Sequence, residues 1–142
     1  MKKYCLLGFI IIGIVMISCN NDDDNKENEN LSSTSVLVGK WGQTSFRQNG
    51  ELMNITDCEK RSTIEFTSDS YTEIGYAPVN TDCQIDFEIT GTWTEEGDKL
   101  TLNYVFEGKT TIDIAMFTIT DDVLTIMYND EGAITTFDYQ KL

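Results

Sequence analysis

From Val36 to the C-terminus the chain alternates apolar and polar residues with a period of two. Between Ile85 and Trp93, for example, every second residue is apolar or glycine, and the residues between them are Asp, Glu and Thr. Such alternation is typical of strands that have one buried and one solvated face. It predicts eight strands, at about residues 40–48, 62–68, 70–77, 83–94, 99–107, 110–120, 122–129 and 133–141.

The segments between these strands predict tight turns, because they are rich in Gly, Asn, Asp and Glu. Asn49-Gly50 and Asn129-Asp130-Glu131-Gly132 are examples. Eight consecutive antiparallel strands joined by short hairpins can close on themselves and so leave no exposed edge. We therefore predict an all-β domain over residues 36–142, folded as an eight-stranded antiparallel up-and-down barrel. An open sandwich is the alternative.

The apolar parity of each strand predicts what lies inside the barrel. The inward set is Ile64, Phe66, Ile74, Tyr76, Ile85, Phe87, Ile89, Leu100, Leu102, Tyr104, Phe106, Ile112, Ile114, Leu124, Ile126, Tyr128, Phe137 and Tyr139. Asp86, Glu88 and Asp113 fall on the other parity and are expected on a solvated outer face. In the strand at 110–120 the apolar parity changes after Met116, which predicts a β-bulge near residues 115–117.

The N-terminus is typical of an export signal. Lys2 and Lys3 precede a nearly unbroken apolar run from Cys5 to Ile17, and Ser18-Cys19 ends it. The run is too short to span a bilayer, and its charged start and small final residue indicate a secretory signal peptide at residues 1–18. The cysteine directly after the cut resembles a bacterial lipobox, which implies that Cys19 is diacylated and becomes the first mature residue. A signal anchor with an incidental cysteine is the alternative.

Residues 19–35 predict a disordered tether behind the lipid, because they offer almost nothing apolar to bury. The acidic run 21–24 resembles the signals that send Bacteroidetes-type lipoproteins to the outer face of the outer membrane. A calcium loop fits less well, since Lys26 occupies a ligand position and no glycine follows at the turn. We expect an outer-membrane lipoprotein, either on the cell surface or facing inward.

Charge excludes some partners. The chain has a formal net charge of −14, and removal of residues 1–18 with their two lysines makes it −16. Nucleic-acid binding needs clustered Lys and Arg and is therefore set aside. For the same reason the acyl chains, not a basic patch, must hold the protein to a membrane.

The remaining cysteines, Cys58 and Cys83, form an even pair in an oxidising compartment and predict a disulfide; two free thiols are the alternative. A metal site is not expected, because the chain has no histidine and no Cys-x-x-Cys spacing.

Several motifs in order suggest a family. Gly39-Lys40-Trp41 resembles the Gly-x-Trp opening of lipocalins, and it is followed by Cys58-Glu59-Lys60, by Cys83 and by Gly91-Thr92-Trp93. Together they resemble the lipocalin-like (calycin) domain of Bacteroidetes-type lipoproteins over residues 36–142. The resemblance implies the same eight-stranded barrel but no defined activity. Lipocalins place a cation over the motif tryptophan, which implies that Lys141 covers Trp41 as a structural plug of the barrel.

No catalytic constellation is present in the sequence, since there is no histidine to activate a nucleophile, and we expect neither an enzyme nor a cofactor. An eight-stranded barrel is either filled by side chains or holds one small ligand. The first hypothesis is a binding module for a small hydrophobic or amphipathic molecule. Its candidate lining residues are Tyr76, Phe87, Tyr104, Tyr128, Tyr139 and, at the far rim, Arg47. The second is a filled barrel whose outer face binds an envelope protein or a polysaccharide.

Overall fold

The computed structural model describes residues 34–142. The predicted signal peptide, the lipid site at Cys19 and nearly all of the predicted tether lie outside the described residues. The strand pairings that close the barrel, the apolar core and the disulfide lie within residues 34–142, so this segment contains what a barrel needs to fold on its own. Within it, no helix is long and apolar enough to cross a membrane.

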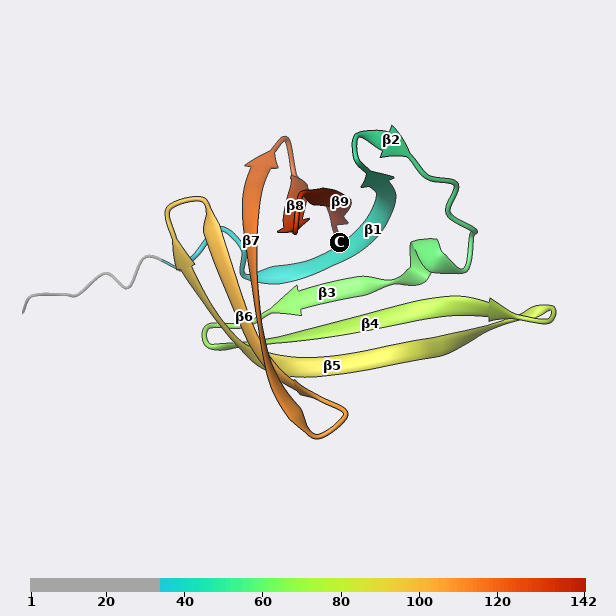
Figure 1. Ribbon diagram of the computed structural model, residues 1–142, viewed down its shortest axis with the longest axis horizontal. Coiled ribbons are helices and arrows are strands. Elements are labelled where there is room, and N and C mark those ends of the chain that lie inside the picture. The colour runs from blue at the N-terminus through green and yellow to red at the C-terminus, as the bar shows by residue number, and fades with distance from the viewer. Residues whose placement is uncertain (1–33) are drawn as a thin grey trace, which may run out of the picture. The chain divides into compact units, whose positions relative to one another are not determined.

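The described chain is all-β and forms one antiparallel meander (Figure 1). Its strands are β1 (Gly39–Gln48), β2 (Glu51–Leu52), β3 (Thr63–Phe66), β4 (Ser70–Val79), β5 (Asp82–Glu96), β6 (Lys99–Phe106), β7 (Lys109–Thr120), β8 (Val123–Asp130) and β9 (Ala133–Lys141). β2 pairs only with the end of β1. β9 pairs with β1 from Trp41–Lys141 to Gln48–Thr135, so the other eight strands form a closed barrel. This confirms the predicted barrel and excludes the open sandwich.

Two bulges change which face a strand presents to the interior. The β1–β9 register shifts between Gln43 and Ser45, so that Thr44 is the extra residue. The β4–β5 register shifts between Gly75 and Tyr76, where Asp86 is the extra residue. An extra residue reverses the alternation beyond it, because successive side chains in a strand point to opposite faces.

The predicted bulge in β7 is wrong. β7 pairs with β6 and β8 in unbroken register, and its inward parity runs through Asp113, Ala115 and Phe117. Ile112 and Ile114, predicted to be inward, are 60% and 58% exposed on the outer face. Asp113 therefore belongs to the interior and not to the solvated face. The pairing of Phe117 with Ile126 on β8 explains this phase, because both large side chains are then buried in the core.

The apolar core fills one end of the barrel, which we call the closed end. Trp41 lies at its centre among buried residues such as Phe66, Leu100 and Leu124. Leu37, just before β1, is fully buried and its carbonyl accepts a hydrogen bond of 2.8 Å from the Trp41 indole N–H. Lys141 Nζ lies 5.1 Å from the centroid of the Trp41 ring. A cation at this distance from an indole contributes about 0.5–2 kcal/mol.

The disulfide between Cys58 and Cys83 is present. Cys58 directly precedes a short 3-10 helix, η1 (Glu59–Arg61), and Cys83 lies at the start of β5. The bond therefore attaches the long β2–β3 connection to the far end of the β4–β5 hairpin (Figure 1). With a sequence separation of 25, the chain-entropy account gives about 3.5 kcal/mol of stabilisation.

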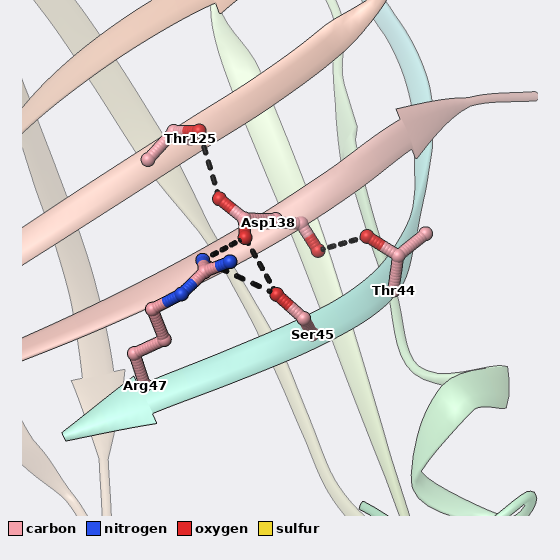
Figure 2. Close-up of polar contacts among 5 residues, drawn as sticks. All are labelled: Thr44, Ser45, Arg47, Thr125 and Asp138. Atoms are coloured by element: carbon pink, nitrogen blue, oxygen red, sulfur yellow. Dashed lines mark hydrogen bonds and ion pairs between the residues drawn. The ribbon is translucent and has the colours of Figure 1, made fainter. Parts of the chain in front are cut away.

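A polar network on the outer face joins β1, β8 and β9 (Figure 2). Asp138 accepts hydrogen bonds from the hydroxyls of Ser45 (2.5 Å) and Thr125 (2.8 Å) and forms an ion pair with Arg47. Asp138 points outward, because its neighbours Phe137 and Tyr139 point inward. Arg47 therefore does not line the interior. The bulge at Thr44 is the reason, since it gives Phe46, not Arg47, the inward parity of Trp41.

We predict that Asp138→Asn destabilises the barrel by about 1–2 kcal/mol at pH 7, since hydrogen bonds to a charged group are worth about 1.5–3 kcal/mol and partial exposure of Arg47 weakens the pair. Burial acts to raise the pKa of Asp138, but hydrogen bonds from Ser45, Arg47 and Thr125 outweigh it and hold the pKa below its usual value. The folded state thus gains stability above the ordinary Asp pKa and loses it as pH falls through the lowered one.

Urea unfolding of residues 34–142 expressed alone, at pH 7 and at pH 3, measures this effect. The difference between the wild type and Asp138→Asn should shrink at pH 3. Glu88→Gln, which removes the same charge from an exposed position on β5, is the matched control and should change stability little. An equal loss for both variants would contradict the role given to Asp138.

Candidate ligand-binding site at the open end of the barrel

Towards the end opposite Trp41, which we call the open end, the inward residues no longer fill the barrel. A cavity of about 260 Å³ lies there. The barrel contributes apolar and aromatic lining from Phe46, Phe87 and Phe137, and the β2–β3 connection contributes Ile55 and Glu59. The remaining lining residues are Gln43, Ser62, Thr63, Glu73, Gly75, Tyr76, Ala77, Asp86 and Tyr139.

A second lobe of about 430 Å³ opens beside the first. It is lined by Glu73, Asp86, Phe87, Ile89, Tyr104 and Phe106. Glu73, Asp86 and Phe87 line both lobes, so the two are parts of one recess, which we call the mouth cavity. The first lobe alone, at about 260 Å³, is just below the size of small-molecule pockets, which span about 300–1,000 Å³, and the second, at about 430 Å³, is within it.

A close approach between β4 and β5 shapes the mouth cavity. A Cβ placed on Gly75 would lie 2.2 Å from Cε1 of Phe87, so the Phe87 ring occupies the space that any side chain at position 75 would need. Glycine at 75 thus lets a large aromatic ring lie between the two lobes. Asp86, the extra residue of the bulge beside it, reaches the same cavity.

Two carboxyl groups share the polar part of the interior, Glu73 on β4 and Asp113 on β7. Burial, with the nearby negative charge of Asp113 as a smaller cause, raises the pKa of Glu73 to about 7. The Tyr104 hydroxyl donates a hydrogen bond of 2.8 Å to Asp113 Oδ2. Burial and this bond raise the pKa of Tyr104 to about 12. Glu73 therefore changes its charge near neutral pH inside the barrel.

Three further phenols surround these carboxyls. Burial is the main cause that raises the pKa values of Tyr71, Tyr128 and Tyr139, and the charge of Glu73 raises each of them further. All three remain neutral hydroxyls at physiological pH. They are hydrogen-bond donors and acceptors inside an otherwise aromatic wall.

The rim of the cavity holds a carboxylate, Glu59, whose pKa is lowered, in contrast to the raised pKa of Glu73. The backbone N–H of Thr56 donates a 2.6 Å hydrogen bond to Glu59 Oε2, which lowers the pKa of Glu59. The Glu59 N–H in turn donates to the Thr56 hydroxyl at 3.2 Å, so the two residues fix the start of η1. Glu59 is thus ionised at neutral pH where the β2–β3 connection meets the cavity.

Four of the six lining residues predicted from sequence line this cavity. Tyr76, Phe87 and Tyr139 line the first lobe, and Tyr104 lines the second. Tyr128 is inward and its ring lies edge-on to Phe137, with centroids 6.1 Å apart. Tyr128 itself lines neither lobe, and Arg47 lies on the outer face.

Sequence reasoning missed Glu73, Asp113 and Phe46. On β4 the inward residues near the mouth are Glu73 and Gly75, whereas the apolar pattern favoured Ile74. The signal that pointed to Glu73 was its parity with Tyr71, which is buried. Among residues 34–142 no group of three or more His, Cys, Asp or Glu side chains is placed to hold a metal ion.

Comparisons with solved structures find several similar chains. A crystal structure of an uncharacterized protein from Bacteroides eggerthii is similar at a TM-score of 0.51 and 13% identity, over 75% of this chain and 99% of that one. A lipocalin-like protein from Bacteroides uniformis gives a TM-score of 0.47 at 14% identity, over 75% and 98% of the two chains. A mutant of the fluorescent protein UnaG gives 0.39 at 14% identity, over 74% and 95%.

No protein with a curated function matches the sequence. The sequence model of the family described as "Lipocalin-like domain" matches residues 37–126, which is more than half of the chain and runs from just before the first Gly-x-Trp to the middle of β8. This chain belongs to the lipocalin-like domain family.

Proposed function

We propose that this protein is a membrane-anchored lipoprotein whose barrel binds one small hydrophobic or amphipathic molecule in the mouth cavity, without catalysing a reaction. The observation that carries the proposal is the contrast between the two ends of the barrel. The closed end is packed with fully buried side chains, whereas the open end keeps a recess with aromatic walls and a few polar groups. That combination is typical of small-molecule sites.

The interior carboxyls support a binding role. A buried carboxyl costs stability unless its charge is compensated, and two carboxyls in one interior cost more. Glu73 and Asp113 are nevertheless both present, and Asp113 is held by Tyr104. Violations of packing rules of this kind are concentrated at functional sites. The carboxyls and phenols are then the polar groups that orient a ligand.

The anchor is the second part of the proposal. Ser18-Cys19 after a short apolar run, followed by an acidic segment, supports lipid attachment at Cys19 and an outer-membrane location. The barrel would then present its cavity at the membrane surface, where amphipathic molecules partition. A lipid anchor also fits a domain whose net charge is too negative for electrostatic binding to anionic lipids.

An envelope interaction module is the alternative, and one observation favours it. Ile112, Ile114 and Met116 form an exposed apolar row on the outer face of β7. Such a row fits the apolar surface of a protein partner. Photo-crosslinking from position 114 in the native host, with position 88 on β5 as the control, distinguishes this alternative. A specific protein adduct from 114 alone, together with an empty mouth cavity, would favour it.

We predict that residues 34–142 bind an uncharged apolar fluorophore such as N-phenyl-1-naphthylamine with micromolar affinity, and that Gln43→Trp weakens binding about ten-fold or more, because an indole at this inward position occupies the cavity. Asn103→Trp, on the exposed face of β6, is the matched control and should leave binding unchanged. A circular dichroism spectrum establishes that each variant is folded. Absence of binding by the wild type would refute the ligand-binding proposal.

We predict that Cys19 carries lipid in the native host. Mass spectrometry of the mature protein should find an N-terminal diacylated cysteine at position 19, and Cys19→Ala should abolish both this modification and recovery of the protein with the membrane fraction. The disulfide variant Cys58→Ser/Cys83→Ser is the control and should remain lipidated. An unmodified N-terminus, or cleavage elsewhere, would contradict the anchor.

We predict that Glu73 makes the barrel less stable as pH rises. Because burial raises its pKa to about 7, the unfolded chain releases this proton at lower pH than the folded one does. Stability therefore falls between the ordinary Glu pKa and pH 7, and it is flat above. The loss is on the order of 2–3 kcal/mol. Glu73→Gln should abolish it.

Urea unfolding at pH 5 and pH 8 checks this prediction. The stability of Glu73→Gln relative to wild type should increase from pH 5 to pH 8, whereas that of Glu88→Gln should stay constant. A difference between wild type and Glu73→Gln that does not change with pH would show that Glu73 has no raised pKa.

A further inference from the structure

The charges that line the mouth cavity are all of one sign. Glu59, Glu73 and Asp86 line it, and Asp113 faces the same interior beneath Tyr104. No lysine or arginine from residues 34–142 lines either lobe. Arg47, the cation expected at this rim, is held by Asp138 on the outer face instead.

An anionic amphiphile is therefore a poor occupant. Its head group would leave water to lie among carboxylates, without a cation to compensate either charge. The negative charge of the whole chain adds to this, since it lowers the local concentration of anions and raises that of cations. A fatty acid would thus meet repulsion both on approach and in the cavity.

A cationic head group meets the opposite conditions. Phe87 and Tyr104 contribute aromatic rings to the same lobe as Glu73, so an ammonium group there has a carboxylate and two aromatic rings as neighbours. Attraction between a desolvated cation and such rings adds to the ion pair. The apolar part of the molecule has Ile89 and Phe106 in the same lobe and Phe46 and Phe137 in the other.

We propose that the mouth cavity selects amphiphiles with a positively charged amine or quaternary ammonium group, and that Glu73 is the residue that pairs with this group. The inference rests on the proposed ligand-binding function and adds the chemical class of the ligand to it. Asp86 and Glu59 lie nearer the rim and attract the same charge as it enters.

Binding of a cation is then linked to the proton on Glu73. The titratable groups that face Glu73 are the carboxyls and phenols of the surrounding strands and of η1: Glu59, Tyr71, Asp86, Tyr104, Asp113, Tyr128 and Tyr139. The raised pKa values of the phenols keep them neutral, and the lowered pKa of Glu59 keeps it negative, in the same pH range. A cation favours ionised Glu73, so its affinity increases as pH rises through about 7.

The test compares three compounds with the same ten-carbon chain on residues 34–142, by displacement of N-phenyl-1-naphthylamine below their micelle concentrations. Decyltrimethylammonium is a permanent cation, decanoate is an anion and decanol is neutral. At pH 8 we expect the cation to bind about ten-fold or more tightly than decanoate, with decanol between them. Between pH 8 and pH 6 the affinity for the cation should fall and that for decanol should stay constant.

Two variants test whether Glu73 is the residue that pairs with the cationic group. Glu73→Gln should weaken binding of decyltrimethylammonium about ten-fold at pH 8 and remove its pH dependence, while decanol binds as before. Glu88→Gln, with the same change in net charge on the outer face, should alter neither. Because decanol reports on the cavity itself, loss of its binding in Glu73→Gln would reveal a structural defect and overturn the assignment.

The outcomes separate this inference from the proposed function. If the fluorophore binds and decanoate displaces it as well as or better than the cation, or if neither ion displaces it, the selectivity is refuted and ligand binding stands. If neither the fluorophore nor any decyl compound binds, the proposed function itself fails.

Discussion

The pairing of β9 with β1 is the constraint on which the rest of this barrel depends. It removes the two sheet edges that an eight-stranded meander would otherwise expose, and it brings Lys141 beside Trp41. The same pairing contains the bulge at Thr44. Closure and bulge together make Trp41 inward at one end of β1 and Phe46 inward at the other, although they are an odd number of positions, five, apart in the sequence.

The two ends of the barrel differ because glycines and aromatic rings are combined differently in them. At the closed end a Cβ on Gly91 would lie 2.8 Å from Cε1 of Tyr71, so the Tyr71 ring packs onto β5 and completes a filled core. At the open end the Phe87 ring occupies the corresponding space at Gly75, but the inward residues around it are Glu73 and Tyr104. Polar side chains must keep access to water or to one another, and so they do not close the space as the core does.

The strands of this fold were predictable from sequence, because turns rich in Gly, Asn and Asp separate the alternating segments clearly. The interior was predictable only where one parity was plainly apolar, as at Leu100 and Leu102. On β7 the local pattern favoured Ile112 and Ile114, whereas the pairing of Phe117 with Ile126 decided the phase. That contact joins different strands and leaves no local signal in the sequence.

Contacts and bulges that leave no local signal also account for the errors in the predicted site. Arg47 was placed in the interior by counting from Trp41, and one extra residue at Thr44 was enough to reverse the result. Glu73 was overlooked because an acidic residue next to the apolar Ile74 looks like a solvated position, which is correct for most strands of a barrel. Aromatic residues are found by pattern because core and ligand contact both require them, so a tyrosine such as Tyr104 is expected inward in either case.

The long β2–β3 connection gives the open end of this small barrel a rim with a fixed structure. A recess formed by strands alone would have its rim set only by mobile hairpins, whereas here Cys58 is tied to Cys83 and Thr56 is bonded to Glu59. The disulfide stabilises the fold by about as much as a buried, uncompensated carboxyl destabilises it, on the order of 3 kcal/mol each. The covalent bond that fixes the rim is thus large enough to offset the loss of stability from Glu73 in the interior.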